Sequence, residues 1–151
     1  MAKLNAEILV IGIGSTLRSD DAAGQRAALV VESWNLPHVT ALALVQLTPE
    51  LAATVSSSKC VIFIDACPSQ MAKSVEVALL EPYDERTAAS VGHSADPRSL
   101  LALAREAFGT CPPAWLVSIP AVDFSIGETL SEMAEHGLAQ ALIRIGALLA
   151  K

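Results

Sequence analysis

The chain has 151 residues, a formal net charge of -6 and 52% hydrophobic residues. This length and apolar content are typical of one globular domain with a substantial core, so we expect a single domain over residues 1–151. The acidic balance argues against non-specific binding to nucleic acid or to anionic membranes, because both rely on clustered Lys and Arg. No apolar run reaches the roughly eighteen residues that a bilayer span requires. Neither nucleic acid nor a membrane is therefore expected as a partner.

The amino-terminal residues and the cysteines bear on localisation. The sequence MAKLNAEILVIGIG enters a strand-like segment without a basic n-region, a long apolar h-region or a small-residue cleavage site. Cys60, Cys67 and Cys111 form no CxxC pair, and their odd number does not suggest a disulfide framework. We therefore expect a cytoplasmic protein with reduced thiols.

The first elements alternate strand and helix. Residues 7–12 (EILVIG) form a short apolar run that ends at glycine, which is typical of a strand buried on both faces. Apolar residues then recur at helical spacing from Ala23 to Trp34, and Ser19 or Asp20 can cap a helix that begins near Asp20.

The same alternation continues through the middle of the chain. Residues 39–45 predict a second strand, and Thr48, Pro49 and Glu50 provide the N-cap, the N1 proline and the early acid of a short helix that ends near the serines at 56–58. Residues 60–66 (CVIFIDA) give the strongest signal for a buried strand.

The carboxy-terminal half is less regular at its start. Residues 75–80 predict a fourth strand whose direction in the sheet is open, and the polar stretch 84–95 predicts a loop. Asp96 and Pro97 then begin a helix that Gly109 ends. A strand over 114–119 follows, and Thr129 with Glu132 makes a capping box that opens the final helix.

This order of elements predicts an α/β fold: a three-layer α/β/α sandwich around a mostly parallel twisted sheet of about five strands. Ligands of such sheets bind beyond the carboxyl ends of the strands. Asp21 follows the first strand and Asp65 closes the third, so both acids are expected to face one cleft. The alternative is structural: Asp20 and Asp21 would complement the helix dipole, and Asp65 would cap a turn.

His93 is the third candidate, because it lies in a loop where it would be accessible to a ligand. A lone loop histidine is commonly only solvated surface. Together, however, two carboxylates and one imidazole offer donors suited to Ni²⁺ or Zn²⁺ and leave coordination positions open. His38 and His136 lack such neighbours, and we expect both at the surface.

Gly12-Ile13-Gly14 invites comparison with a dinucleotide-binding loop. The third glycine of that fingerprint is replaced by Leu17, and Asp20 and Asp21 would repel a pyrophosphate at the helix start. The glycines are better explained by a tight turn and a close backbone approach.

Five segments in order and spacing resemble the hydrogenase maturation proteases, also called hydrogenase expression and formation peptidases, over nearly the whole chain. They are ILVIGIGSTLRSDDAAG, QLTPELA, VIFIDA, GHSADP and IPAVDFSIGETLS. Two departures are Gly14-Ser15-Thr16, where the family usually has Gly-Asn, and Asp21-Ala22-Ala23, where it usually has a glycine after the acidic pair. QLTPEL is similar to a subgroup linked to NAD-coupled or bidirectional hydrogenases.

The resemblance implies a phosphorylase/hydrolase-like fold and metal-contacting residues at Asp21, Asp65 and His93. It implies an aspartyl-type endopeptidase that removes the C-terminal extension of a nickel-iron (NiFe) hydrogenase large-subunit precursor after nickel insertion. The three side chains would complete the coordination of the nickel, which the substrate supplies, and the ion would polarise the scissile carbonyl or activate water. Either aspartate can instead act as a base. We expect a monomer whose resting form is metal-free.

Two alternatives remain open at this point. Cys67 can serve as a nucleophile with His93 as its base, although the sequence around it lacks the context of a thiol protease. The protein can also be a non-catalytic module that holds nickel or a small metabolite in the same cleft.

Overall fold

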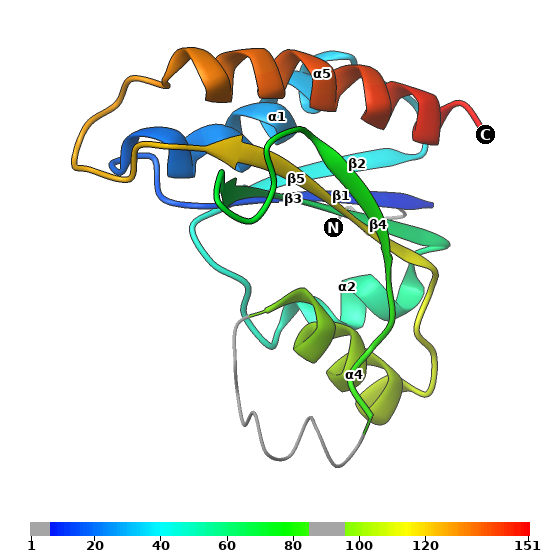
Figure 1. Ribbon diagram of the computed structural model, residues 1–151. Helices are drawn as coiled ribbons and strands as arrows, with labels where there is room; N and C mark the ends of the chain where they lie inside the picture. Colours follow the sequence, from blue (N-terminus) through cyan, green and yellow to red (C-terminus); the bar gives the residue numbers. More distant parts are fainter. Residues whose placement is uncertain (1–6, 85–95) are drawn as a thin grey trace.

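The structure, a computed structural model, describes residues 7–84 and 96–151. In this part of the chain a five-stranded sheet has the order β2-β1-β3-β5-β4, and helices cover both of its faces (Figure 1). The predicted three-layer α/β/α sandwich is confirmed. The strands are β1 (Ile8–Ile13), β2 (Val39–Leu44), β3 (Cys60–Pro68), β4 (Glu76–Leu80) and β5 (Ala114–Ala121). The helices are the 3-10 helix η1 (Ser19–Ala22), α1 (Ala23–Ser33), α2 (Leu51–Ser57), α4 (Pro97–Phe108) and α5 (Glu132–Leu149).

Four of the strands are parallel. β2, β1, β3 and β5 run in one direction, whereas β4 pairs with β5 antiparallel and forms one edge of the sheet. The carboxyl ends of the parallel strands therefore meet at one edge, on the left of Figure 1. The loops after β1, β2, β3 and β5 all leave the sheet there, and we call this side the carboxyl edge.

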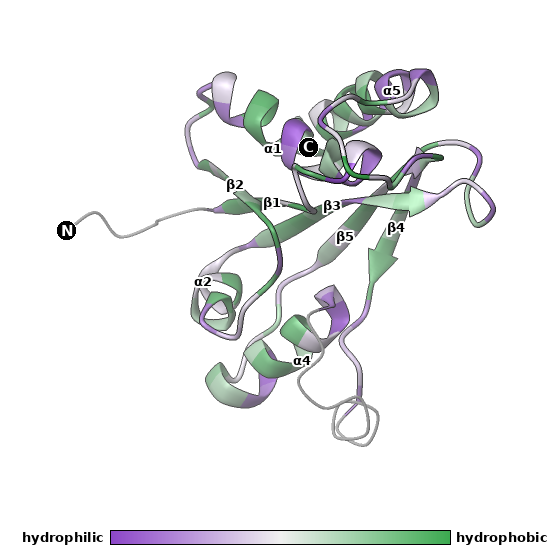
Figure 2. Ribbon diagram, turned by 90° about the vertical axis from the view of Figure 1, so that its left-hand side faces the viewer, coloured by the Kyte–Doolittle hydropathy of each residue, from purple (hydrophilic) through white to green (hydrophobic). Residues whose placement is uncertain are grey.

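Alternate residues of the strands fill two cores. In β3, Val61 and Phe63 pack with α2 and α4, whereas Ile62 and Ile64 pack with α1 and α5. Because both faces are buried, β1 and β3 are nearly continuous apolar runs (green in Figure 2), as expected for central parallel strands. Side-chain alternation along β3 thus assigns each of its residues to one of the two faces.

Several predictions differ from the structure, and β3 and β5 each extend two residues beyond their predicted ends, to Pro68 and Ala121. α2 begins at Leu51 with Glu50 as its N-cap, because the Thr48 and Pro49 carbonyls accept turn hydrogen bonds just before the helix. The capping box of Thr129 with Glu132 is wrong, since the Ser131 side chain caps α5. Trp34 was expected on the buried stripe of the first helix but is the exposed C-cap of α1.

Other predicted termini are confirmed. The Asp96 carboxylate accepts a hydrogen bond from the Ser99 backbone N–H at 2.9 Å and Pro97 occupies the first turn of α4. Gly109 ends that helix in the left-handed conformation, at φ 82°. The predicted loop over 84–95 lies outside the described residues, except for Asp84.

Close contact between α1 and the central strands depends on glycine. A Cβ atom at Gly24 would lie 2.5 Å from the carbonyl oxygens of both Ile13 and Ile64. A Cβ at Gly12 would collide with the Gly24 carbonyl. The start of α1 therefore crosses directly over the ends of β1 and β3, and no side chain fits between them.

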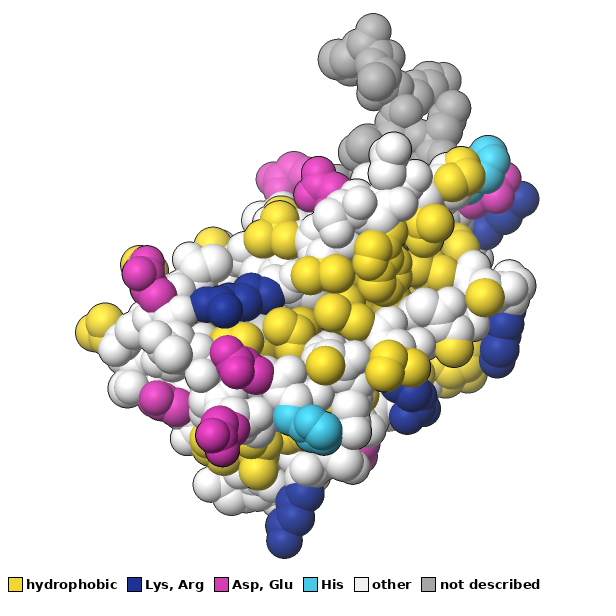
Figure 3. Space-filling view, turned by 90° about the horizontal axis from the view of Figure 1, so that it is seen from above, with side chains coloured by type: hydrophobic (Ala, Val, Ile, Leu, Met, Phe, Trp, Pro, Cys, Tyr) yellow, Lys and Arg dark blue, Asp and Glu magenta, His cyan; other side chains and the backbone are white. Residues whose placement is uncertain are grey.

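A shallow depression of about 230 Å³ lies between β4 and α5 and is lined by Val75, Gln140, Ile143 and Arg144. It opens on the α1 and α5 face, where hydrophobic and charged side chains are interspersed (Figure 3). None of its lining residues follows a parallel strand at the carboxyl edge. Among the described residues, no helix combines the length and apolar character of a bilayer span.

We expect Gly24→Ala to destabilise the fold by about 2–4 kcal/mol, because two backbone carbonyls would have to move away from the new methyl group. Gly146→Ala in α5 is the matched control, because a Cβ there meets nothing within 4 Å. The control should gain up to about 1 kcal/mol from helix propensity. Urea denaturation of both variants measures the difference, and equal stabilities would contradict the predicted close contact.

Candidate functional site

The loop between β1 and η1 folds back on itself and carries Asp21. Its bend is at Gly14, which has a φ of 144°, and a Cβ there would collide with the Asp21 carbonyl. The Asp21 carboxylate accepts a hydrogen bond from the Ser15 backbone N–H at 2.8 Å. Asp21 is thus held at both its backbone and its side chain.

Gln25 of α1 holds the loop between β1 and η1 in place. Its side chain is buried in α1, and its Nε2 donates a hydrogen bond to the Gly14 carbonyl at 2.5 Å. The Gly14 backbone N–H in turn donates to the Leu44 carbonyl at 3.0 Å, which ties the loop to the end of β2. No sequence pattern singles out Gln25, because its partner is a backbone carbonyl.

Asp20 is completely buried and ties η1 to the loop after β5. Its carboxylate accepts hydrogen bonds from the backbone N–H groups of Val122 at 2.9 Å and Asp123 at 3.0 Å. It also accepts from Ser131, through the backbone N–H and the hydroxyl, at 2.7 Å each. Burial alone would raise the pKa of Asp20, but these four hydrogen bonds outweigh it and leave the pKa below its ordinary value.

Asp20 therefore has a structural role that the sequence did not distinguish from that of Asp21. The predicted contribution of Asp20 to a helix cap is wrong, because no side chain caps η1 or α1. The Ser131 hydroxyl donates to Asp20 and accepts from the Ala134 backbone N–H at 3.1 Å. One serine thus caps α5 and anchors it to η1.

Asp65 lies within β3 rather than at its end, because β3 continues to Pro68. The last pair between β1 and β3 is Gly12 with Ile64, so Asp65 is the first β3 residue beyond β1. By alternation with Phe63, its side chain lies on the α2 and α4 face. It therefore reaches the carboxyl edge, as predicted, although three further residues extend the strand.

The two predicted carboxylates lie close enough to interact. Burial raises the pKa of Asp65 from 3.8 to about 6, a hydrogen bond from the Ala66 backbone N–H at 2.8 Å opposes the rise, and the negative charge of Asp21 adds to it. A carboxyl group with a pKa near 6 exchanges protons close to neutral pH, which is a property of catalytic acids and bases.

Polar groups continue from Asp65 across the neighbouring strands. Asp65 pairs with Ser118 of β5, which pairs with Glu76 of β4, so the three side chains share one face. Cys67, two residues after Asp65, lies on the same face. Burial, Glu76 and Asp65 together raise the pKa of its thiol, which disfavours the thiolate that a nucleophile requires.

His93 lies outside the described residues. Within residues 7–84 and 96–151, no three His, Cys, Asp or Glu side chains gather closely enough to hold a metal ion. Asp21 and Asp65 therefore offer two oxygen ligands of the predicted set of three. His38 and His136 are exposed, as expected (histidines are cyan in Figure 3).

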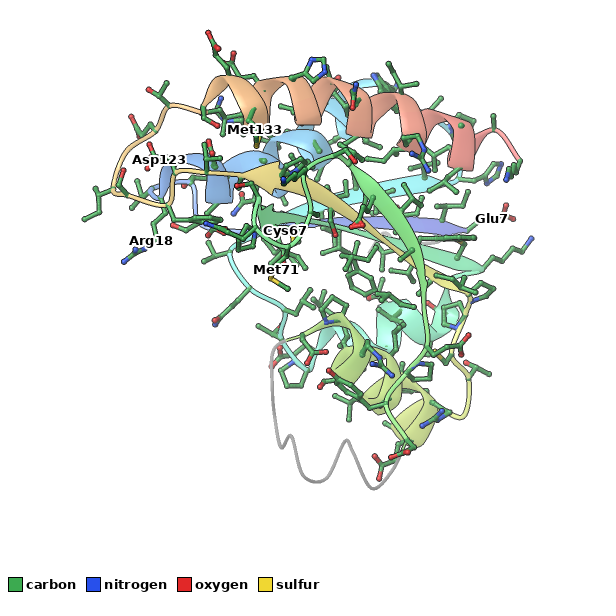
Figure 4. The ribbon with its side chains drawn as sticks, in the orientation of Figure 1. Glu7, Arg18, Cys67, Met71, Asp123 and Met133 are labelled. Atoms are coloured by element: carbon green, nitrogen blue, oxygen red, sulfur yellow. The ribbon has the colours of Figure 1, made fainter. Side chains whose placement is uncertain are left out.

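Figure 4 shows how the loops surround this edge. Cys67 and Met71 lie together at the end of β3, and Arg18 and Asp123 lie in adjacent loops on the same side. Glu7 marks the opposite end, where β1 begins. The Ser19 backbone N–H donates to the Gly127 carbonyl at 2.8 Å, so the loops after β1 and β5 are joined.

Comparison with solved structures shows that the described fold is shared with several hydrogenase maturation endopeptidases. The HybD endopeptidase of E. coli has a TM-score of 0.70 and 22% identity, covering 95% of this chain and 91% of that one. The hydrogenase 2 maturation peptidase of a Thaumarchaeota archaeon has a TM-score of 0.71 and 23% identity, with coverages of 95% and 97%. The NiFe hydrogenase maturation protease HycI of Thermococcus kodakarensis has a TM-score of 0.70 and 20% identity, with coverages of 95% and 92%. A scan against protein-family models and a search of curated proteins gave no match.

We expect Asp20→Asn to lower the free energy of unfolding at pH 7 by about 2–4 kcal/mol, because the new NH₂ group would face backbone N–H donors. Ser131→Ala should cost about 1–2 kcal/mol through loss of the cap and the hydroxyl bond. The double variant should lose less than the sum, because the two side chains share one interaction. Chemical denaturation measures all three, and strictly additive losses would contradict the coupling.

The stability that the Asp20 carboxylate contributes depends on pH with a definite sign. The folded-state pKa of Asp20 lies below its ordinary value of 3.8, so its contribution is present above that value and is lost as the pH falls through the lower folded-state pKa. The difference between wild type and Asp20→Asn should therefore shrink in strong acid. Asp123→Asn, at an exposed neighbouring position, is the matched control and should show a smaller loss.

Asp65→Asn should stabilise the fold at pH 7, because the folded protein raises the pKa of this carboxyl to about 6 and so penalises its charged form. The rise from 3.8 corresponds to at most about 3 kcal/mol, and partial exposure reduces the expected gain to about 1–2 kcal/mol. The gain should vanish below about pH 4, where both states are protonated. Denaturation at pH 7 and pH 3.5 tests this, and a stability loss at pH 7 would contradict it. Glu76→Gln, at an exposed position, serves as the control.

Proposed function

We propose that this protein is an endopeptidase that removes the C-terminal extension of a NiFe hydrogenase large-subunit precursor after nickel insertion. The observation that carries the proposal is the interacting pair of Asp21 and Asp65 at the carboxyl edge, with the pKa of Asp65 near 6. Solved proteins with this fold are named hydrogenase maturation endopeptidases. The site and the fold thus favour the same chemistry.

The pair provides negatively charged oxygen ligands for a metal that belongs to the substrate. In the proposed complex, Asp21 and Asp65 would complete the coordination of the precursor's nickel, with His93 as the third ligand that the sequence predicts. This contact would place the adjacent peptide bond at the carboxyl edge. Since protons compete with the metal for Asp65, recognition should weaken below about pH 6.

Hydrolysis also requires proton transfer. In the alternative in which Asp65 does not bind nickel, its pKa near 6 would let it accept a proton from an attacking water at neutral pH and return it to the leaving amine. The precursor's nickel would polarise the scissile carbonyl. Asp21, held by the Ser15 backbone N–H, would keep its carboxylate beside Asp65 throughout. The raised pKa of Cys67 disfavours the thiol mechanism.

The remaining properties follow from this role. The resting enzyme would be metal-free, because two or three ligands open on one side should bind a free ion weakly. We further propose that it acts as a monomer in the cytoplasm. Its three free cysteines are in keeping with a reducing compartment.

A processing assay tests the proposal. Purified protein is mixed with nickel-loaded and nickel-free precursor, and the product masses are recorded. Wild type should shorten only the loaded precursor, Asp21→Asn should reduce the rate by at least about 100-fold, and Cys67→Ala should retain the wild-type rate. The Asn amide can still accept the Ser15 hydrogen bond, so the loop should keep its fold.

Two other results would redirect the interpretation. Loss of cleavage in Cys67→Ala would revive the thiol mechanism. If cognate precursors of several hydrogenase types stay intact, while the protein still binds nickel or a metabolite, the non-catalytic module becomes the better explanation. The wild-type rate should also rise with pH through about 6, as Asp65 loses its proton.

A further inference from the structure

Large apolar side chains reach into solvent from four loops of the carboxyl edge. Within the described residues, four of the five most exposed ones lie in its loops: Ile126 at 85%, Met71 at 77%, Val45 at 66% and Leu17 at 61%. The fifth, Ile143 at 73%, lies on α5. We call Leu17, Val45, Met71 and Ile126 the apolar rim.

Hydrogen bonds join the rim loops to one another around the carboxylates. Val45 follows Leu44, whose carbonyl accepts from the Gly14 backbone N–H at 3.0 Å, in the loop that holds Asp21. The Gly127 backbone N–H donates to the Leu17 carbonyl at 2.9 Å, so Ile126 and Leu17 lie in adjoining loops. These three rim positions are thus fixed relative to Asp21.

Met71 completes the rim on the side of β3. Its backbone N–H donates to the Pro68 carbonyl at 2.8 Å, in the turn that follows the strand of Asp65. The neighbouring Ser69 backbone N–H donates to the Ala121 carbonyl at 2.9 Å, beside the loop that binds Asp20. Figure 4 shows Met71 at this end of the molecule, near Cys67.

We infer that the apolar rim docks the folded body of the precursor, while the carboxylate pair receives the segment to be cut. This inference rests on the proposed function and adds its recognition surface. The rim is continuous with the proposed active site, and its side chains come from four loops around the carboxylates. An extended tail at the pair would contact the centre, so the rim would meet the surface from which the tail emerges.

The physical chemistry of the rim fits such a partner. Exposed apolar side chains gain free energy when a protein surface removes them from water, by about 25 cal/mol per Å². Here apolar side chains surround a polar centre, whereas protein–protein interfaces usually have an apolar core and a polar rim. This arrangement suits a polar reaction that must take place inside a contact sealed by apolar side chains.

The test compares rim and control variants of the full chain. Val45→Ser/Met71→Ser and Leu17→Ser/Ile126→Ser remove apolar surface without touching the carboxylates, and Ile143→Ser removes a comparably exposed side chain from α5. With nickel-loaded precursor, each double variant should raise KM about tenfold or more and leave kcat within about twofold. Ile143→Ser should change neither constant.

A short synthetic peptide with the sequence of the precursor tail separates body from tail recognition. Its weak binding should be the same for wild type and rim variants, because it lacks the folded body. An equal loss for peptide and precursor would overturn the inference, since the rim would then bind the tail. Unchanged KM values for the precursor in both double variants would also overturn it.

Failure of the proposed function can be distinguished from failure of the docking inference. If wild type does not cleave the precursor, its direct binding can be measured by biolayer interferometry without interference from cleavage. Binding that the rim variants weaken would support the docking surface alone, and absence of binding would overturn both ideas. If sedimentation shows a wild-type dimer that the rim variants dissociate, with KM unchanged, a second copy occupies the rim and the inference falls.

Discussion

The buried carboxylate of Asp20 accepts four hydrogen bonds and holds the loops of the carboxyl edge together. Asp20 has no exposed surface, and burying a charge is costly unless hydrogen bonds replace the lost water. Its donors come from the loop after β5 and from the first turn of α5. The loop after β1 therefore cannot shift without leaving the buried charge of Asp20 with no hydrogen-bond donors. The same constraint helps to set the position of Asp21, which is the next residue.

Three aspartates at one edge differ because their surroundings differ. Asp20 is surrounded by donors, which hold its pKa low, and it serves the fold. Asp65 is partly buried, has one local donor and faces the charge of Asp21, so its pKa rises to about 6. The number of hydrogen-bond donors, rather than the residue type, separates the lowered pKa of Asp20 from the raised pKa of Asp65. A pKa raised by burial and by a neighbouring charge is common at functional sites, and both causes act on Asp65.

The sequence predicted the layers and the place of the acid pair because both follow from local patterns. Apolar runs that end at Gly12 and near Asp65 identify central parallel strands, and the ends of parallel strands share an edge. The role of Asp20 could not be predicted, because its partners lie more than 100 residues away. The hydrogen bond from the Ser131 hydroxyl to Asp20 also explains why the predicted N-cap of α5 was wrong. Thr129 and Ser131 are both good N-caps, and Asp20 selects the serine.

Those distant donors also decide when the site can form. Asp20 is synthesised before Val122 and Ser131, which lie more than 100 residues further along the chain. Until then the Asp20 carboxylate lacks these donors, and the loop that carries Asp21 is held only by contacts with earlier residues such as Leu44 and Gln25. Contacts of such large sequence separation form late because a long loop must close first. A nascent or truncated chain without Val122 and Ser131 would thus contain Asp21 and Asp65 but lack the hydrogen bonds that hold the loop of Asp21 against the loop after β5.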